Sequence, residues 1–156
     1  MTTTDSSGAP RPTLYEHAGG RPMLRQLAEA QYRRCLTDPI LIEIFGTESH
    51  PSHVDQLADW LTEVLGGPPL YTEQHGGHGG LLKRHANLAI QDRHRARFVE
   101  VFIEAADEVG LPADRQFRQR FLDYLEWGSN IAQEVSQPGA DTSSNDPVPV
   151  WTWEPS

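Results

Sequence analysis

Glycine and histidine are concentrated in one segment of the sequence. LGGPPLYTEQHGGHGGLLKRH, at residues 65–85, holds six of the thirteen glycines and three of the seven histidines. Three kinds of chemistry use such a segment: a glycine loop cradles phosphate, grouped histidines bind zinc, and paired glycines form tight turns that aim one histidine at a site. The rest of the chain has to decide between them.

The sequence argues against both the phosphate loop and the zinc site. A Walker-type phosphate loop needs glycine, four residues and then Gly-Lys-Ser or Gly-Lys-Thr between a strand and a helix, and the segment supplies neither. A zinc site of His75, His78 and His85 lacks a thiolate pair, because the chain has a single cysteine. The glycines would also leave these ligands poorly ordered before a metal binds.

The third reading concerns His85. Glycine pairs at 76–77 and 79–80 predict a long loop that presents the segment LLKRHANLAI at a fixed angle. His85 lies there among apolar residues, namely Leu81, Leu82, Leu88 and Ile90. The residues alone leave His85 open as a ligand or as a structural histidine held by hydrogen bonds.

Apolar residues at helical spacing predict the elements that must position this loop. The period appears in four stretches, residues 24–35, 54–65, 98–109 and 117–135. Gly110 is expected to end the third helix and Pro138 to follow the fourth. No stretch alternates as a strand would. The sequence therefore predicts an all-α domain.

Composition divides the chain into a domain and two tails. Residues 1–12 read as a flexible N-terminal tail, 13–135 as the domain, and 136–156 as a tail rich in Pro and Ser. Trp151 and Trp153 in the second tail have large apolar side chains, whose exposure to water is unfavourable. We expect them to dock on the domain.

Bulk properties exclude some partners. A chain of 156 residues predicts one domain, and a net charge of −9 argues against nucleic-acid or anionic-membrane binding, which needs clustered Lys and Arg. No 18 apolar residues run together, so no membrane span is expected. Cys35 has no second cysteine to pair with, which favours a reducing, cytoplasmic location.

Four separated motifs then occur in one order: LYEHAGG, AQYRRCLTDPILIEIF, WLTEVLGGPPLY and HGGHGGLLKRHANLAI. In these motifs the chain resembles the group II truncated haemoglobins over about residues 13–135. The resemblance implies an all-α truncated globin fold, a two-over-two helical sandwich around haem b. It also implies that His85 is the proximal ligand of the haem iron, aimed by the glycines.

The resemblance assigns further residues. Tyr32 falls at a ligand-contacting position, with an ordinary core tyrosine as the alternative, and Phe45 at an aromatic position against the haem. Lys83 and Arg84 adjoin His85, where they either bind haem propionates or are solvated surface residues. The remaining cofactor contacts that it implies are Leu65, Tyr71, Leu82, Arg84, Leu88 and Phe98.

Two positions depart from the family pattern. Counting from His85 places Phe98 where group II members usually carry a tryptophan, so a hydrogen-bond donor to the bound ligand is missing. Glu63 aligns with a ligand-facing position, although helical angle alone puts it on the solvent side. We take Glu63 and Tyr32 as a candidate catalytic pair for proton transfer. No haem role is expected for the other histidines, His17, His50, His53, His75, His78 and His94.

The function implied by the resemblance is reversible binding of O2, and of NO or CO, at a five-coordinate haem iron. One alternative is a haem-dependent redox enzyme, an NO dioxygenase or peroxidase-like protein, supplied with electrons by an unidentified reductase. Another is a cofactor-free helical interaction module. A monomer or a homodimer is expected.

Overall fold

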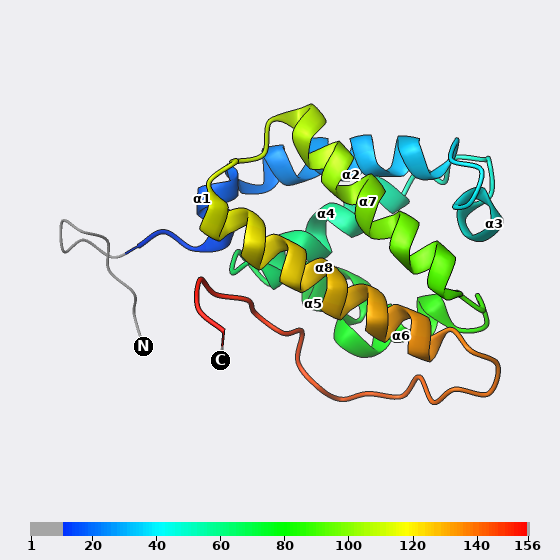
Figure 1. Ribbon diagram of the computed structural model, residues 1–156. Coiled ribbons are helices and arrows are strands. Elements are labelled where there is room, and N and C mark those ends of the chain that lie inside the picture. The colour runs from blue at the N-terminus through cyan, green and yellow to red at the C-terminus, as the bar shows by residue number, and fades with distance from the viewer. Residues whose placement is uncertain (1–10, 156) are drawn as a thin grey trace.

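The computed structural model describes residues 11–155, and within them it has eight helices and no strand (Figure 1). The prediction of an all-α fold is confirmed. The expected N-terminal tail lies outside the described residues except for residues 11 and 12. The helices are α1 (Leu14–Ala18), α2 (Gly20–Cys35), α3 (Ile42–Phe45), α4 (His53–Val64), α5 (Leu70–His75), α6 (Gly77–His85), α7 (Asp92–Val109) and α8 (Arg115–Val135).

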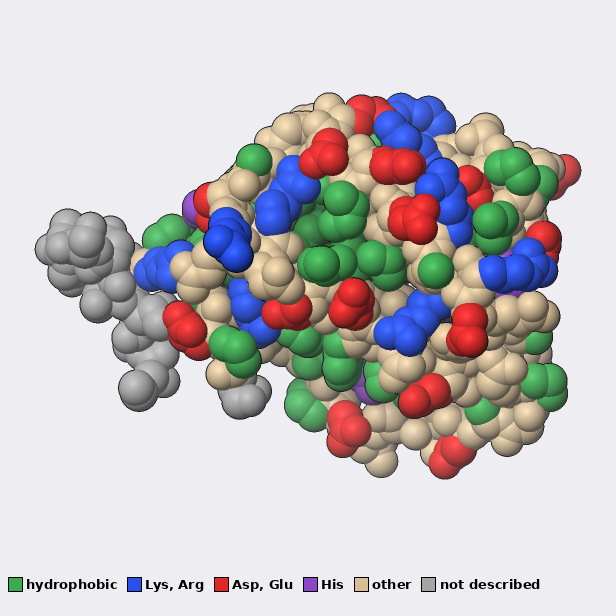
Figure 2. Space-filling model, in the orientation of Figure 1, with side chains coloured by type: hydrophobic (Ala, Val, Ile, Leu, Met, Phe, Trp, Pro, Cys, Tyr) green, Lys and Arg blue, Asp and Glu red, His purple; other side chains and the backbone are tan. Residues whose placement is uncertain are grey.

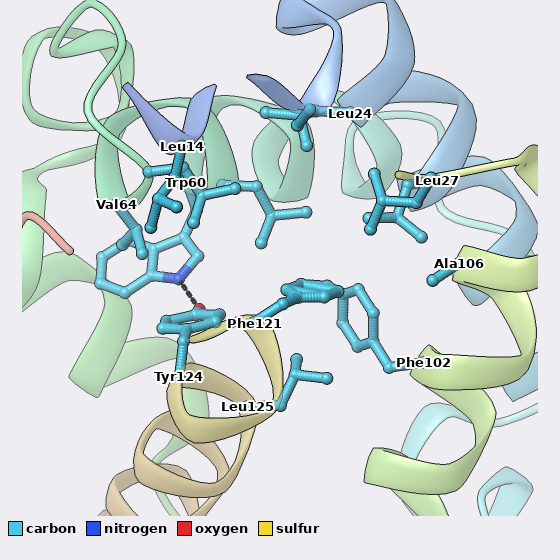
Figure 3. Packing of buried hydrophobic residues seen from close by; sticks show 14 of the residues in the cluster. Leu14, Leu24, Leu27, Trp60, Val64, Phe102, Ala106, Phe121, Tyr124 and Leu125 are labelled. Carbon is cyan, nitrogen blue, oxygen red and sulfur yellow. Dashed lines mark hydrogen bonds between the residues drawn. The ribbon is translucent and has the colours of Figure 1, made fainter. Parts of the chain in front are cut away.

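The four long helices form two stacked pairs. Helix α2 packs against α4 and α7, and α7 packs against α8, so that α7 and α8 cross in front of α2 and α4 in Figure 1. This is the expected two-over-two sandwich. Apolar faces of all four helices meet in one core, part of which Figure 3 shows. There the indole Nε1 of Trp60 donates a hydrogen bond of 2.5 Å to the hydroxyl of Tyr124, tying α4 to α8.

Local sequence signals fix several helix ends. The hydroxyl of Thr13 accepts a hydrogen bond from the backbone N–H of Glu16, and the Glu16 carboxylate accepts one from the backbone N–H of Thr13, which caps the beginning of α1. At the beginning of α8, the carboxylate of Asp114 accepts the backbone N–H of Phe117. Helix α7 ends at Gly110, whose φ of +74° only glycine adopts without strain. The end of α7 predicted from Gly110 is thus confirmed.

The glycine-rich segment is helical, so the prediction of a long loop is wrong. Helices α5 and α6 meet at Gly76, which has a φ of +85°. A side chain at Gly80 would place its Cβ 2.4 Å from the carbonyl oxygen of His75. Tertiary packing outweighs the low helix propensity of glycine here, because α5 and α6 approach too closely for any other residue at this position.

Residues 136–155, which we call the C-terminal strap, return from the end of α8 along α6 and α5 to α1 (Figure 1). The carbonyl oxygen of Ser144 lies against Gly79, and the Ser144 hydroxyl is 3.2 Å from Nδ1 of His78. The backbone N–H of Trp151 donates to the carbonyl oxygen of Val64 at 2.7 Å.

The end of the C-terminal strap is anchored by its tryptophans. The indole of Trp153 is 3% exposed and donates to the carbonyl oxygen of Pro12 at 2.7 Å. Guanidinium groups stack on both rings, Arg11 on Trp153 at 3.5 Å and Arg120 on Trp151 at 4.6 Å. The strap is therefore packed as part of the domain.

Charged side chains of both signs alternate on the surface in Figure 2. Arg34 of α2 pairs with Glu108 of α7 at 2.9 Å, and Arg97 of α7 pairs with Asp38, in the loop after α2, at 2.8 Å. None of the described helices is long and apolar enough to cross a membrane.

Candidate functional site

A cavity of about 450 Å³ lies between the two layers, with walls from α2 to α8. Volumes of this order are typical of cofactor sites. Seven of the predicted site residues line it: Tyr32, Phe45, Tyr71, Arg84, His85, Leu88 and Phe98. Glu63, Leu65 and Leu82 are not among its lining residues.

His85 is the last residue of α6, and its ring faces a carbonyl of its own helix. Its Nδ1 lies 2.8 Å from the carbonyl oxygen of Leu81. Because a carbonyl only accepts, Nδ1 carries the hydrogen, and Nε2 keeps its lone pair. Burial lowers the pKa of His85, although the Leu81 bond opposes this effect. A neutral imidazole with Nε2 available is the form that binds iron.

Apolar side chains surround His85. Leu81, Leu88 and Ile90 line the cavity beside it, and the rings of Phe45 and Phe98 stack with centroids 6.3 Å apart and planes within 1°. The wall of the cavity beside the imidazole is therefore largely apolar.

Tyr32 lines the cavity from α2 and is 3% exposed. Its hydroxyl oxygen accepts the backbone N–H of His50 at 3.0 Å. Its ring stacks on the imidazole of His53, with centroids 4.0 Å apart. Since the oxygen already accepts from a backbone group, the phenolic hydrogen remains free to donate.

Three histidines that were expected to lie elsewhere also line the cavity: His50, His53 and His94. Burial, with smaller contributions from His50 and His85, lowers the pKa of His53 to about 4. The signal for His53 was present in the sequence. His53, Leu57 and Trp60 follow helical spacing along α4, and all three line the cavity.

Two arginines lie at the wall of the cavity. Arg84 donates to the hydroxyl of Tyr71 at 2.6 Å and to the carbonyl oxygen of His75 at 2.9 Å. Arg95, which sequence analysis missed, donates to Ser129 at 3.1 Å. Lys83 is exposed and is not a lining residue. Arg84 and Arg95 thus place positive charge beside an apolar space.

Glu63 does not reach the cavity, and its placement there from the alignment is wrong. It is 7% exposed, and its carboxylate accepts the backbone N–H of Thr72 at 2.8 Å and the Thr72 hydroxyl at 2.5 Å. Its neighbour on the same face, Asp59, binds Arg21 and His75, each at 2.9 Å. The carboxylates of Asp59 and Glu63 therefore link α4 to α2 and α5. This face of α4 packs against those two helices and faces neither the solvent nor the cavity.

Of the two remaining predicted contacts, Leu65 does not reach the cavity, because it is 1% exposed and belongs to the hydrophobic core. Leu82 lines an adjoining cavity of about 110 Å³, which shares His85, Leu81 and Phe98 with the large one. The cofactor contact expected of Leu82 therefore stays a prediction.

The zinc reading of the segment finds no support in the geometry. His75 pairs with Asp59, His78 with Ser144 and His85 with Leu81, so the three rings have separate partners. Over residues 11–155, no three His, Cys, Asp or Glu side chains are grouped so that they could hold a metal ion.

Comparison with known proteins agrees with this geometry. Residues 13–127 match the family model of the bacterial-like globins. The chain is 37% identical to the group 2 truncated hemoglobin YjbI of Bacillus subtilis over 63% of its own length and 74% of the relative. The crystal structure of the group II truncated hemoglobin of Bacillus anthracis superposes with a TM-score of 0.71 at 25% identity, covering 82% of this chain and 93% of that chain.

A haemoglobin structure from Thermobifida fusca gives a TM-score of 0.69 at 28% identity, over 81% of this chain and all of that chain. The chain therefore belongs to the bacterial-like globin family, and its resemblance to the group II truncated haemoglobins is confirmed. Membership of a globin family implies that it binds haem.

The residues present fit that cofactor. A neutral imidazole lies in the wall of an apolar cavity of about 450 Å³, which suits an iron porphyrin, and two arginines suit its carboxylates. His85 would hold the iron, while Phe45, Phe98 and Leu88 would pack on the ring.

Proposed function

We propose that the protein is a haem b globin that reversibly binds O2, and NO or CO at the same place, on a five-coordinate iron held by His85. The observation that carries the proposal is the bond from Nδ1 of His85 to the carbonyl oxygen of Leu81, 2.8 Å long, in the wall of the apolar cavity. When bound, haem would supply the iron that binds a diatomic gas.

The chain's own residues define what happens around that position. Tyr32 offers a phenolic hydrogen to a ligand, because its oxygen is already occupied by the N–H of His50. Phe45 and Phe98 would pack on the haem, and Arg84 and Arg95 would pair with its propionate carboxylates. A B. subtilis structure described as a truncated oxygen-avid haemoglobin is 32% identical to this chain, with a TM-score of 0.67, which supports O2 as a ligand.

Redox turnover in the same pocket, as NO dioxygenation or peroxide reduction, is the second candidate. The stacked pair of Tyr32 and His53 favours it, because a hydroxyl donor lies against an imidazole whose lowered pKa keeps it neutral at pH 7. Such turnover needs an electron donor, which we assign to an unidentified reductase. A cofactor-free interaction module would give no role to the imidazole of His85 in the wall of this cavity.

Absorption spectroscopy of the haem-reconstituted protein tests the proposal. The wild type should show a sharp Soret band that shifts on reduction and addition of CO, and His85→Ala should lose or displace it. His78→Ala is the matched control, because His78 lies on the same helix and contacts Ser144. If haem binds the wild type no better than an unrelated helical protein, the proposal is wrong.

A further inference from the structure

The turn that follows His85, residues 86–90, has an unfavourable backbone conformation, and we call it the proximal turn. Asn87 has a φ of +64° and Ala89 a φ of +52°. Within residues 11–155 these are the only residues other than glycine with a positive φ. Asparagine adopts this region fairly readily, whereas alanine is strained there. A strained residue persists only where the surrounding structure holds it in place.

The end of α8 holds the proximal turn through three hydrogen bonds. The carbonyl oxygen of Ser136 accepts the backbone N–H of Ala89 at 2.8 Å, and the Ser136 hydroxyl accepts that of Ile90 at 3.0 Å. The side chain of Gln137 donates to the carbonyl oxygen of Ile90 at 2.8 Å. Both backbone polar groups of Ile90 are therefore bound by residues 46 and 47 positions further along the chain.

The Ser136 hydroxyl is oriented for this contact. Ser136 is 0% exposed, and its hydroxyl donates to the carbonyl oxygen of Gln133 at 2.7 Å. Because a hydroxyl has a single hydrogen, this bond turns its lone pairs toward the N–H of Ile90. Ser136→Ala would remove the acceptor of that N–H while leaving the backbone bond to Ala89 in place.

The proximal turn begins where the helix that carries His85 ends. Helix α6 ends at His85, and Ala86 has an extended ψ of 134°. The bond from His85 to Leu81 orients the ring relative to α6, but it does not fix the end of α6 relative to the rest of the domain. The attachment of the proximal turn to α8 supplies that second restraint. Leu88 and Ile90 of the same turn line the cavity beside His85.

We propose that Ser136 is a positioning residue for His85: with the help of Gln137 it holds the strained proximal turn, and through that turn it keeps the imidazole at one distance and angle to the haem iron. The inference rests on the proposed haem function. Without the Ser136 hydroxyl the turn would relax, because Ala89 would leave the region of positive φ. His85 would then meet the iron over a range of orientations.

Resonance Raman spectroscopy of the ferrous, haem-loaded protein tests this role, because the stretching band of the bond between iron and the proximal imidazole reports its geometry. Ser136→Ala should broaden that band and speed haem transfer to excess apomyoglobin about fivefold, the equivalent of one lost hydrogen bond. Gln137→Ala, at an exposed position, should act in the same direction to a smaller extent. Asp114→Ala is the matched control, because it removes the cap at the opposite end of α8.

Adding Ala89→Gly to Ser136→Ala separates the strain of the turn from a general loss of stability. Glycine adopts a φ of +52° without strain, so the haem-transfer rate of the double variant should return toward that of wild type. A double variant that loses haem as fast as Ser136→Ala overturns the positioning role. So does a Raman band that is unchanged in Ser136→Ala, or one that is broadened equally in Asp114→Ala.

Thermal unfolding of the haem-free variants checks that each one folds, and should Ser136→Ala fail to fold, Gln137→Ala decides alone. An unchanged band and transfer rate in Gln137→Ala would then overturn the inference. A wild type that binds haem and CO while these variants have no effect defeats this inference only. A wild type without a Soret band defeats the proposed function too.

Discussion

At the scale of single residues, a backbone contact sets the chemistry of Tyr32. The N–H of His50 holds the phenolic oxygen from a turn that precedes α4. That contact fixes the orientation of the phenol ring, and it leaves the hydroxyl hydrogen free to bond to another partner. A side-chain partner would have been free to rotate away.

Replacing Tyr32 by Phe should therefore speed O2 dissociation about tenfold or more, because a charge-assisted hydrogen bond contributes ~1.5–3 kcal/mol and each 1.4 kcal/mol is tenfold. Stopped-flow measurement of the dissociation rate gives the comparison, with CO dissociation as the reference. An unchanged O2 rate would move the stabilising role to another side chain.

The pKa of His53, lowered to about 4, predicts how the haem-free protein responds to acid. The unfolded chain protonates this imidazole near pH 6.5, but the folded protein does so only near pH 4. Stability is thus fully present above pH 6.5 and falls as pH drops toward 4, by about 2 kcal/mol after allowance for partial exposure.

Urea unfolding at a series of pH values measures this loss. His53→Gln should remove that part of the pH dependence, and His85, whose pKa is also lowered by burial, should keep its own. Parallel curves for wild type and variant between pH 4 and 6.5 would contradict the shift.

The sequence identified much of the cavity wall but not all of it. His85, Tyr32 and Phe45 were recognised because family motifs fix their positions, and the structure brings them to one cavity. His53 was missed because the apolar pattern of its helix starts only at residue 54, which left His53 outside the predicted helix. Glu63 was misplaced because its true partner, Thr72, lies in a segment that was expected to be a loop.

At the scale of elements, the crossing of α5 and α6 determines where His85 lies. Gly80→Ala should force α6 away from the carbonyl oxygen of His75, 2.4 Å from the added Cβ, and lower the free energy of unfolding by about 1–3 kcal/mol. Gly128→Ala is the control, because its Cβ would be 3.6 Å from Tyr124 and alanine favours a helix. Denaturant titration of both variants compares them, and equal stabilities would mean that the crossing adapts.

Glu63 joins α4 to the beginning of α5. Glu63→Gln should cost about 1–2 kcal/mol of unfolding free energy, since the charge-assisted bonds to Thr72 weaken. Peroxide and O2 kinetics should remain those of wild type because Glu63 is outside the cavity lining. Glu73→Gln, an exposed glutamate of α5, is the control. A change in the pH dependence of peroxide reactivity would restore the catalytic role first expected.

Helical periodicity predicted the four long helices well, because their apolar faces meet one core. It failed for α5 and α6, whose glycines weaken the pattern while serving a close approach between helices. The close approach of α5 and α6 depends on how the chain folds, so the local sequence pattern does not predict it.

At the scale of the whole molecule, the C-terminal strap connects α6 and the end of α4 to the residues that precede α1. Trp153→Ala should lower the free energy of unfolding by roughly 2–4 kcal/mol, through lost packing and the lost bond to Pro12. Val150→Ala is the control within the strap, because Val150 is 59% exposed. Differential scanning calorimetry should show a lower Tm for the first variant alone, and a lowered Tm in both would point to a general effect of the strap.

The bond between Trp153 and Pro12 also gives the molecule a mechanical property. It joins residues near the two ends of the described chain, and Arg11 also stacks on the Trp153 ring, so a pulling force applied between residues 11 and 155 would load the contacts of Trp153 first. The hydrogen bond between Trp151 and Val64 would break next, so the contacts of the strap would be lost one after another. Under tension the strap would peel off at low force, while the helices that surround the cavity remained packed.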